Sequence, residues 1–235
     1  MSTVDELRDW SFSVGESQLG LRVHRATKWL ARRTLFPYLR LSVHGREHLD
    51  TPGPLLVAPV HRSNLDSLIV PGLSNRRLRA LAKESLFKVK PLAWYISALG
   101  AFPLARGTAD REAMRTSRLV LDRGEPLLVF PEGTRQIGRT VSELFDGTMW
   151  LAAKTGAQVV PVGVAGTEQA LPPGGRFPGR GPCSVVVGVP MRVPEGRVSR
   201  KTLADLTVEL HSRLQAVNDL AHDAVGGARP KTEAA

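Results

Sequence analysis

The chain has 235 residues, of which 42% are hydrophobic and 23% are charged, so it can bury one sizeable core and has an ordinary globular composition. Its 32 Lys and Arg residues outnumber 22 Asp and Glu residues, and the net charge of +10 favours partners that carry phosphate, anionic lipid or nucleic acid. The sequence contains no run of about 20 apolar residues, which argues against a transmembrane helix. Its single cysteine, Cys183, excludes an intramolecular disulfide framework and fits a reducing cytosol.

The first 40 residues are expected to form an amphipathic appendage. Residues 1–14 mix acidic and apolar side chains without a clear period, which predicts poor order and shows no signal-peptide pattern. An apolar stripe at helical spacing follows, formed by Leu19, Val23, Ala26 and Leu30. Most of the nearby cations fall on the opposite side of this helix, and they are Arg22, Arg25, Lys28 and Arg32. This pattern is typical of a helix on an anionic membrane surface, although a helix docked on its own domain would share it.

A polar stretch containing His61 and Asp66 joins two apolar runs, residues 55–58 and 68–70. If the chain turns from a strand into a helix near residue 63, both side chains converge beside the carboxyl end of the strand, where open α/β sheets place their chemistry. On one continuous helix they would lie about 140° apart, so a pair requires His61 on the loop. A neutral imidazole oriented by a carboxylate can take a proton from an alcohol. A purely structural His–Asp pair is the alternative, because this spacing alone is a weak signal.

Strands alternate with helices along the rest of the chain. Strands are expected at 41–43, 76–82, 127–130, 159–164 and 184–189, helices at 110–122, 144–154 and 203–217, and a loop at 171–182. This order predicts a single-domain α/β fold, with a largely parallel sheet flanked by helices. The predicted boundaries are 1–40 for the appendage, 41–225 for the domain and 226–235 for a disordered tail. Residues 44–48 match a zinc-binding pattern, but Gly45 predicts a turn there, so no metal site is expected.

Four motifs occur in a fixed order along the chain. They are the H-x4-D stretch from His61 to Asp66, a glycine-to-arginine segment from Gly100 to Arg106, FPEGTR at residues 130–135, and the strand Val160-Pro161-Val162. With this combination, over about residues 43–167, the chain resembles the glycerolipid acyltransferase family that includes 1-acylglycerol-3-phosphate O-acyltransferases.

The resemblance implies transfer of a fatty acyl chain from a thioester to the free hydroxyl of 1-acylglycerol-3-phosphate, which makes phosphatidic acid in phospholipid synthesis. His61 would be the general base and Asp66 would orient it, with direct attack by the hydroxyl. The implied substrate-binding residues are Arg106 and Arg135 for the acceptor phosphate, Lys83 near it, and Glu132, Gly133 and Thr134 around the acceptor. No cofactor is implied, because acyl-CoA or an acyl-carrier protein is the co-substrate.

Two departures from the family pattern bear on the acceptor. Val60 stands where asparagine is common, and Asp146 stands where lysine is common, so its carboxylate would repel a phosphate. Glycerol-3-phosphate or another lysolipid is therefore an alternative acceptor.

A non-catalytic basic membrane-binding module would also explain the charge, but it gives no reason for the ordered motifs. A nucleic-acid partner is not expected, because no recognisable nucleic-acid-binding motif is present. The expected location is cytoplasmic, at the inner face of the cell membrane and in peripheral contact with its anionic surface.

Overall fold

The computed structural model describes residues 4–104 and 109–226. These residues form a seven-stranded sheet in the order β1-β7-β6-β2-β5-β3-β4. The strands are β1 (Ser42–His44), β2 (Leu55–Pro59), β3 (Arg79–Lys83), β4 (Ala101–Leu104), β5 (Leu127–Leu128), β6 (Gln158–Ala165) and β7 (Ser184–Val187). From β6 to β4 all neighbours are parallel, whereas β7 runs antiparallel to β6 and parallel to β1. The predicted α/β fold with a largely parallel sheet is confirmed.

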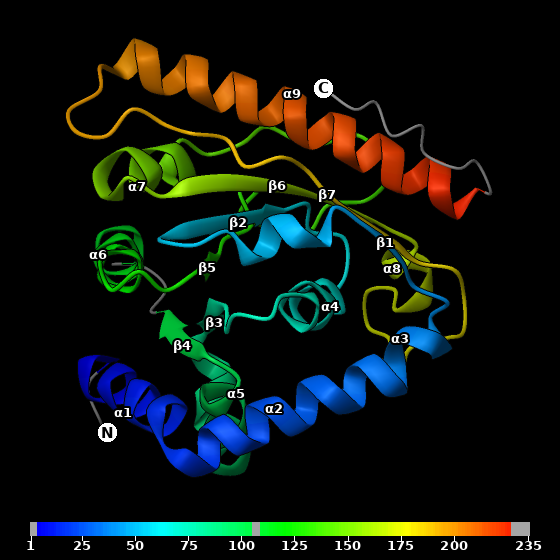
Figure 1. Cartoon of the computed structure of the whole chain (residues 1–235). Helices are drawn as coiled ribbons and strands as arrows, with labels where there is room; N and C mark the ends of the chain where they lie inside the picture. Colours follow the sequence, from blue (N-terminus) through cyan, green and yellow to red (C-terminus); the bar gives the residue numbers. More distant parts are fainter. Residues whose placement is uncertain (1–3, 105–108, 227–235) are drawn as a thin grey trace.

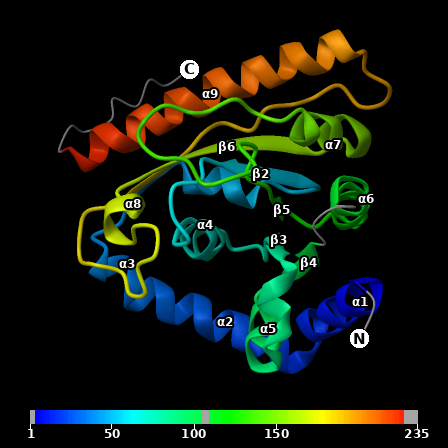
Figure 2. The same ribbon diagram turned by 180° about the vertical axis from the view of Figure 1, so that it is seen from behind.

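Helices cover both faces of this sheet (Figures 1 and 2). The α-helices are α1 (Val4–Glu16), α2 (Gln18–Arg33), α3 (Leu35–Tyr38), α4 (Asp66–Leu73), α5 (Lys90–Ala98), α6 (Ala109–Asp122), α7 (Gly147–Thr155), α8 (Thr167–Ala170) and α9 (Arg200–Val225), and two 3₁₀ turns are η1 (Arg46–Asp50) and η2 (Glu84–Lys88). Helix α9 lies along one face, and α2 and α4 lie on the opposite side. This double cover explains why every residue of β2 is buried and why the strand reads as a continuous apolar run.

Helix α1 contradicts the expectation of poor order for residues 4–14, whereas residues 1–3 lie outside the described part of the chain. Phe12 stacks on Phe102 of β4 with ring centroids 5.5 Å apart, and the Arg79 guanidinium lies 4.8 Å from the Phe12 ring centroid. Arg79 also donates a hydrogen bond of 3.2 Å to the Glu16 carboxylate. A helix this short is marginal alone, so tertiary contacts that no local pattern displays stabilise it.

Helix α2 confirms the predicted periodic helix and docks on the domain through its polar face. Lys28 Nζ donates to the carbonyl of Ser74 at 2.8 Å, and Arg32 Nε donates to the carbonyl of Gly72 at 2.8 Å. These carbonyls lie at the carboxyl end of α4, where helices leave acceptors unpaired and favour cations. The apolar side of α2 consequently faces outward: Leu19 and Leu30 of the stripe are 60% and 53% exposed, and the adjacent Trp29 is 64% exposed.

Among the helices that the structure describes, none combines the length and the apolar character needed to cross a bilayer. The predicted tail lies outside the described residues except for Gly226, which caps α9.

Candidate active site

The predicted site residues follow neighbouring strands of the sheet. His61 and Asp66 come after β2, residues 132–135 come after β5, and Lys83 is the last residue of β3. Arg106 would follow β4 but lies outside the described residues. Because β2, β5, β3 and β4 are parallel neighbours, their carboxyl ends meet at one edge of the sheet. The structure thus brings the described candidates to the same edge.

His61 and Asp66 form a hydrogen-bonded pair at this edge. Helix α4 begins at Asp66, so His61 lies on the loop, as the pairing requires. The distance from His61 Nδ1 to Asp66 Oδ2 is 3.3 Å, and the Asp66 side chain is fully buried while that of His61 is 16% exposed. This pairing places the imidazole proton on Nδ1 and leaves a lone pair on Nε2. No described residue hydrogen-bonds to Nε2, so this nitrogen is available to a substrate hydroxyl.

The Asp66 carboxylate is held through both of its oxygens. The backbone N–H groups of Arg62 and Ser63 donate to Oδ2 at 2.6 and 2.7 Å, and the Thr167 hydroxyl donates to Oδ1 at 2.7 Å. Sequence reasoning missed Thr167, which belongs to none of the four motifs. The one available signal was its position just after β6, the other neighbour of β2. Thr167 therefore positions the pair from the opposite side to the FPEGTR motif.

Thr167→Val is expected to lower kcat by about 10- to 100-fold, because a hydrogen bond to a charged group contributes about 1.5–3 kcal/mol. The loss should appear in kcat and not in the KM of the acceptor, since Thr167 contacts Asp66 and not the substrate. Steady-state kinetics check this, with Thr167→Ser as the control that keeps the hydroxyl and restores most of the rate. An equal loss in both variants would contradict a positioning role.

Phe130 fixes the plane of the imidazole. Its ring stacks on His61 with centroids 3.8 Å apart and an angle of 19° between the planes. Because Phe130 follows β5 and His61 follows β2, the stack links the ends of two adjacent strands. The imidazole ring of His61 is thus held by Asp66 at Nδ1 and by the face of the Phe130 ring.

Glu132 has a different use from the acceptor contact expected from the sequence. Its carboxylate accepts hydrogen bonds from the backbone N–H of His61 at 2.9 Å, from Arg62 Nη1 at 2.8 and 3.0 Å, and from the backbone N–H of Ser142 at 3.0 Å. The side chains of Glu132 and Arg62 are 0% and 2% exposed. Since protein donors occupy both oxygens, Glu132 holds the His61 turn in place and is not free to bind an acceptor.

The next residues of the motif turn toward solvent. Gly133 has a φ of +71°, and a Cβ there would lie 2.7 Å from the ring of Phe145. Thr134 Oγ1 accepts a hydrogen bond of 3.0 Å from Gln136. Arg135 is exposed, as is Lys83, and neither has an ion-pair or hydrogen-bond partner among the described residues. The sheet edge that carries His61 therefore also carries two exposed cations that have no partner among the described residues.

The two departures from the family pattern have structural explanations. Asp146 accepts a hydrogen bond of 2.7 Å from the Thr207 hydroxyl, so its carboxylate is engaged by α9. Val60 is fully buried, and its N–H donates to the carbonyl of Val162 at 3.0 Å, which extends the β2–β6 ladder. Val60 is thus a core position, whereas Asp146 is an exposed position that is hydrogen-bonded to α9.

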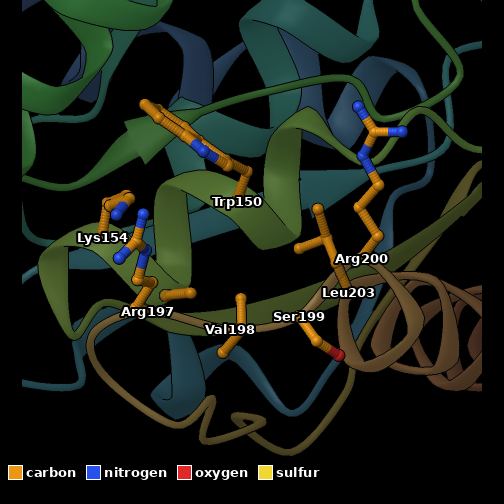
Figure 3. A pocket seen from close by; sticks show the side chains of 8 residues that line it. Trp150, Lys154, Arg197, Val198, Ser199, Arg200 and Leu203 are labelled. Carbon is orange, nitrogen blue, oxygen red and sulfur yellow. The ribbon is translucent and has the colours of Figure 1, made fainter.

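No group of three or more metal-ligating side chains occurs in the described part of the chain. A cavity of about 300 Å³ opens elsewhere, between the last turn of α7 and the start of α9 (Figure 3). Lys154 and Arg197 lie at one end of it and Arg200 at the other. Because α7 ends just before β6 begins, this cavity lies near the amino ends of the strands, away from His61.

The family model described as Acyltransferase matches residues 40–165. The 1-acyl-sn-glycerol-3-phosphate acyltransferase LPAT1, chloroplastic, of Arabidopsis thaliana is 27% identical over 154 residues, which are 64% of this chain and 43% of that protein. The 1-acyl-sn-glycerol-3-phosphate acyltransferase of Bacillus subtilis is 24% identical over 185 residues, which are 76% of this chain and 88% of that protein. The chain thus spans less than half of the plant relative and most of the bacterial one.

Among solved structures, the 1-acyl-sn-glycerophosphate acyltransferase PlsC from Thermotoga maritima superposes with a TM-score of 0.68 and 28% identity. The match covers 84% of this chain and 79% of that one. The family match spans more than half of the chain and contains the His61–Asp66 pair, Lys83 and the FPEGTR motif. On this evidence the chain belongs to the Acyltransferase family.

Proposed function

We propose that this protein transfers a fatty acyl chain from an acyl thioester to the free hydroxyl of 1-acylglycerol-3-phosphate, forming phosphatidic acid. The observation that carries the proposal is the His61–Asp66 pair at the same sheet edge as Arg135 and Lys83, where neither Nε2 nor the two cations have a partner among the described residues. A base for a hydroxyl and cations for a phosphate are the two features that such an acceptor requires. The printed names of the bacterial and plant relatives support the same acceptor.

In the proposed reaction, His61 Nε2 takes the proton of the acceptor hydroxyl while its oxygen attacks the thioester carbonyl. The C–O bond forms, the C–S bond breaks, and the leaving thiolate receives the proton from the imidazolium. Asp66 stabilises that imidazolium through Nδ1. The donor is acyl-CoA or an acyl-carrier protein, and no cofactor takes part.

Thioester consumption by the purified protein tests this function directly. Palmitoyl-CoA and vesicles would be supplied with lysophosphatidate, with glycerol-3-phosphate or with no acceptor. We expect turnover to depend on lysophosphatidate. Faster turnover with glycerol-3-phosphate would assign the alternative acceptor. Thioester loss that no acceptor stimulates, with either an acyl-CoA or an acyl-carrier-protein donor, would contradict acyl transfer and favour a non-catalytic binding module.

Arg135→Ala is expected to raise the KM of the phosphorylated acceptor by about 10- to 100-fold, because a charge-assisted hydrogen bond contributes about 1.5–3 kcal/mol. Its guanidinium is exposed and has no partner among the described residues, so its removal should leave the stability unchanged. Arg139 of the same loop is a matched control, because Asp219 and Asp223 already pair with it. Acceptor and donor KM values would be compared for both alanine variants. A change confined to the donor KM would reassign Arg135 to the donor.

We further propose that the outward face of α2 docks on the anionic inner face of the cell membrane. Leu19, Trp29 and Leu30 form its exposed apolar surface, and Arg22 and Arg25 are exposed on the same helix. Apolar side chains flanked by arginine are suited to the interfacial region of an anionic bilayer. The polar face is occupied by the domain, so this surface is left for the lipid.

Trp29→Ser with Leu30→Ser is expected to weaken partitioning onto vesicles that contain phosphatidylglycerol by at least about tenfold. Fully burying one large apolar side chain contributes about 1.5–3 kcal/mol, and both side chains are more than half exposed in the protein alone. Flotation in a density gradient measures the effect. Val208→Ser is the control, since Val208 is 69% exposed on α9, on the other side of the molecule. Equal flotation of all variants would exclude α2 as the membrane contact.

A further inference from the structure

The loop at residues 171–182 carries an exposed phenylalanine that no packing explains. Phe177 is 86% exposed, more than any other large hydrophobic side chain among the described residues. Arg176 and Arg180 are also exposed, and neither has an ion-pair partner in the described part of the chain. The loop thus exposes an aromatic ring together with two arginines that have no ion-pair partner among the described residues, a combination that suits contact with an anionic membrane surface.

Hydrogen bonds attach this loop to two other parts of the fold and also close it on itself. The N–H of Gly179 donates to the carbonyl of Ala170 at 2.7 Å, which closes the loop on itself. The Tyr38 hydroxyl of α3 donates to the carbonyl of Pro178 at 3.2 Å, next to the phenylalanine. The Ser63 hydroxyl donates to the carbonyl of Leu171 at 2.9 Å. The loop therefore joins α3 to the turn that carries His61.

The position of the loop continues the outward surface of α2. Figures 1 and 2 both show the segment after α8 lying beside α3, which directly follows α2. Tyr38 itself is 44% exposed at this junction. The loop therefore lies beyond the carboxyl end of α2, beside the short helix α3 that follows it.

We propose that the 171–182 loop is a second membrane contact, in which Phe177 enters the interfacial region of an anionic bilayer and Arg176 and Arg180 contact lipid phosphates. This inference rests on the proposed docking of α2. It adds a second contact, because docking through α2 alone does not require the loop to touch the lipid. Aromatic side chains favour the boundary between headgroups and acyl chains, and arginine forms bidentate hydrogen bonds with phosphate. The internal hydrogen bonds already order the loop, which lowers the entropy cost of insertion.

The contact has a consequence for the active site. Ser63 lies between His61 and Asp66 and holds the base of the loop, so a loop anchored in the bilayer fixes the height of the catalytic turn above the lipid. An acceptor that keeps its acyl chain in the bilayer presents its hydroxyl at that height. The loop thereby places the base at the depth of its substrate.

A fluorophore at position 177 tests the insertion. Phe177→Cys in the full chain would be labelled with an environment-sensitive dye, and Val208→Cys on α9 would be labelled as the control. The native Cys183 is 1% exposed, and burial raises the pKa of its thiol to about 11, so wild-type protein treated with the same dye serves as the labelling blank. Vesicles of phosphatidylcholine with one third phosphatidylglycerol would be added, with and without lipids that carry a quencher in the acyl chain.

We expect the label at 177 to shift to shorter wavelength and to be quenched from within the acyl region, while the label at 208 stays unchanged. In addition, Phe177→Ser should float about tenfold less well than Val208→Ser. If the labelled protein floats but the label at 177 neither shifts nor is quenched, α2 alone carries the docking and the loop proposal is overturned. If wild-type protein does not float with the vesicles, the proposed docking of α2 is overturned, and the loop proposal that rests on it is overturned too. Flotation without any label distinguishes this outcome from the previous one.

Discussion

His61→Ala is expected to lower kcat for acyl transfer by about 10²- to 10⁴-fold, the usual contribution of a positioned general base. The rate should fall because no other described residue offers a lone pair where Nε2 lies. The acceptor KM should change little, and kcat/KM should fall with kcat, since the proton is transferred only in the transition state. Rates at saturating lysophosphatidate and palmitoyl-CoA measure the loss.

The fold should survive this substitution, because Asp66 keeps three other donors, namely Thr167 and the backbone N–H groups of residues 62 and 63. His44→Ala is the matched control, since His44 is exposed on β1 and belongs to no site contact. A variant at position 61 that unfolds at the wild-type temperature and turns over at a near-normal rate would end the general-base assignment.

Glu132→Gln is expected to lower the free energy of unfolding by about 3–5 kcal/mol, the cost of removing one partner from a buried ion pair. The guanidinium of Arg62 would keep its charge in a site where its side chain is 2% exposed. An amide also has one acceptor oxygen in place of two, so it cannot serve His61 N–H, Ser142 N–H and Arg62 together. Loosening of the His61 turn should lower kcat as well.

Denaturant unfolding measures this loss, and Glu209→Gln provides the comparison. Glu209 pairs with Arg213 at 2.6 Å, four residues along α9, but both side chains are more than 40% exposed. Such a surface pair contributes only about 0.3–0.5 kcal/mol. If both substitutions cost the same, Glu132 has no special structural use and its predicted contact with the acceptor returns to consideration.

Much of the site could be predicted because its residues stand directly after strands. The apolar runs before His61 and before residue 130 are visible in the sequence, a strand is expected at 76–82, and alternation with helices indicates parallel strands. Parallel neighbours then place the following residues at one edge without any knowledge of the full topology. The direction of β7 could not be obtained in this way, because periodicity carries no information on strand direction.

Residues that act through partners far away in the sequence could not be predicted. Thr167 lies 101 positions from Asp66 in the sequence. The hydrogen bond from its hydroxyl to Asp66 can be predicted only when the pairing of β6 with β2 is known. Glu132 was visible as part of a motif, but the burial of its carboxylate against Arg62 depends on how two loops meet. Helix α1 is a third case, since its order depends on Phe102 and Arg79 and not on its own pattern.

Because α2 docks on the domain through its polar face, its exposed apolar face should also affect how the purified protein behaves in solution. Lys28 and Arg32 attach the helix to the carboxyl end of α4, so the apolar side chains Leu19, Trp29 and Leu30 stay exposed to water in plain buffer. Such a patch makes molecules stick to one another as the concentration rises and to detergent when it is offered. We therefore expect a monodisperse preparation to need lipid or mild detergent.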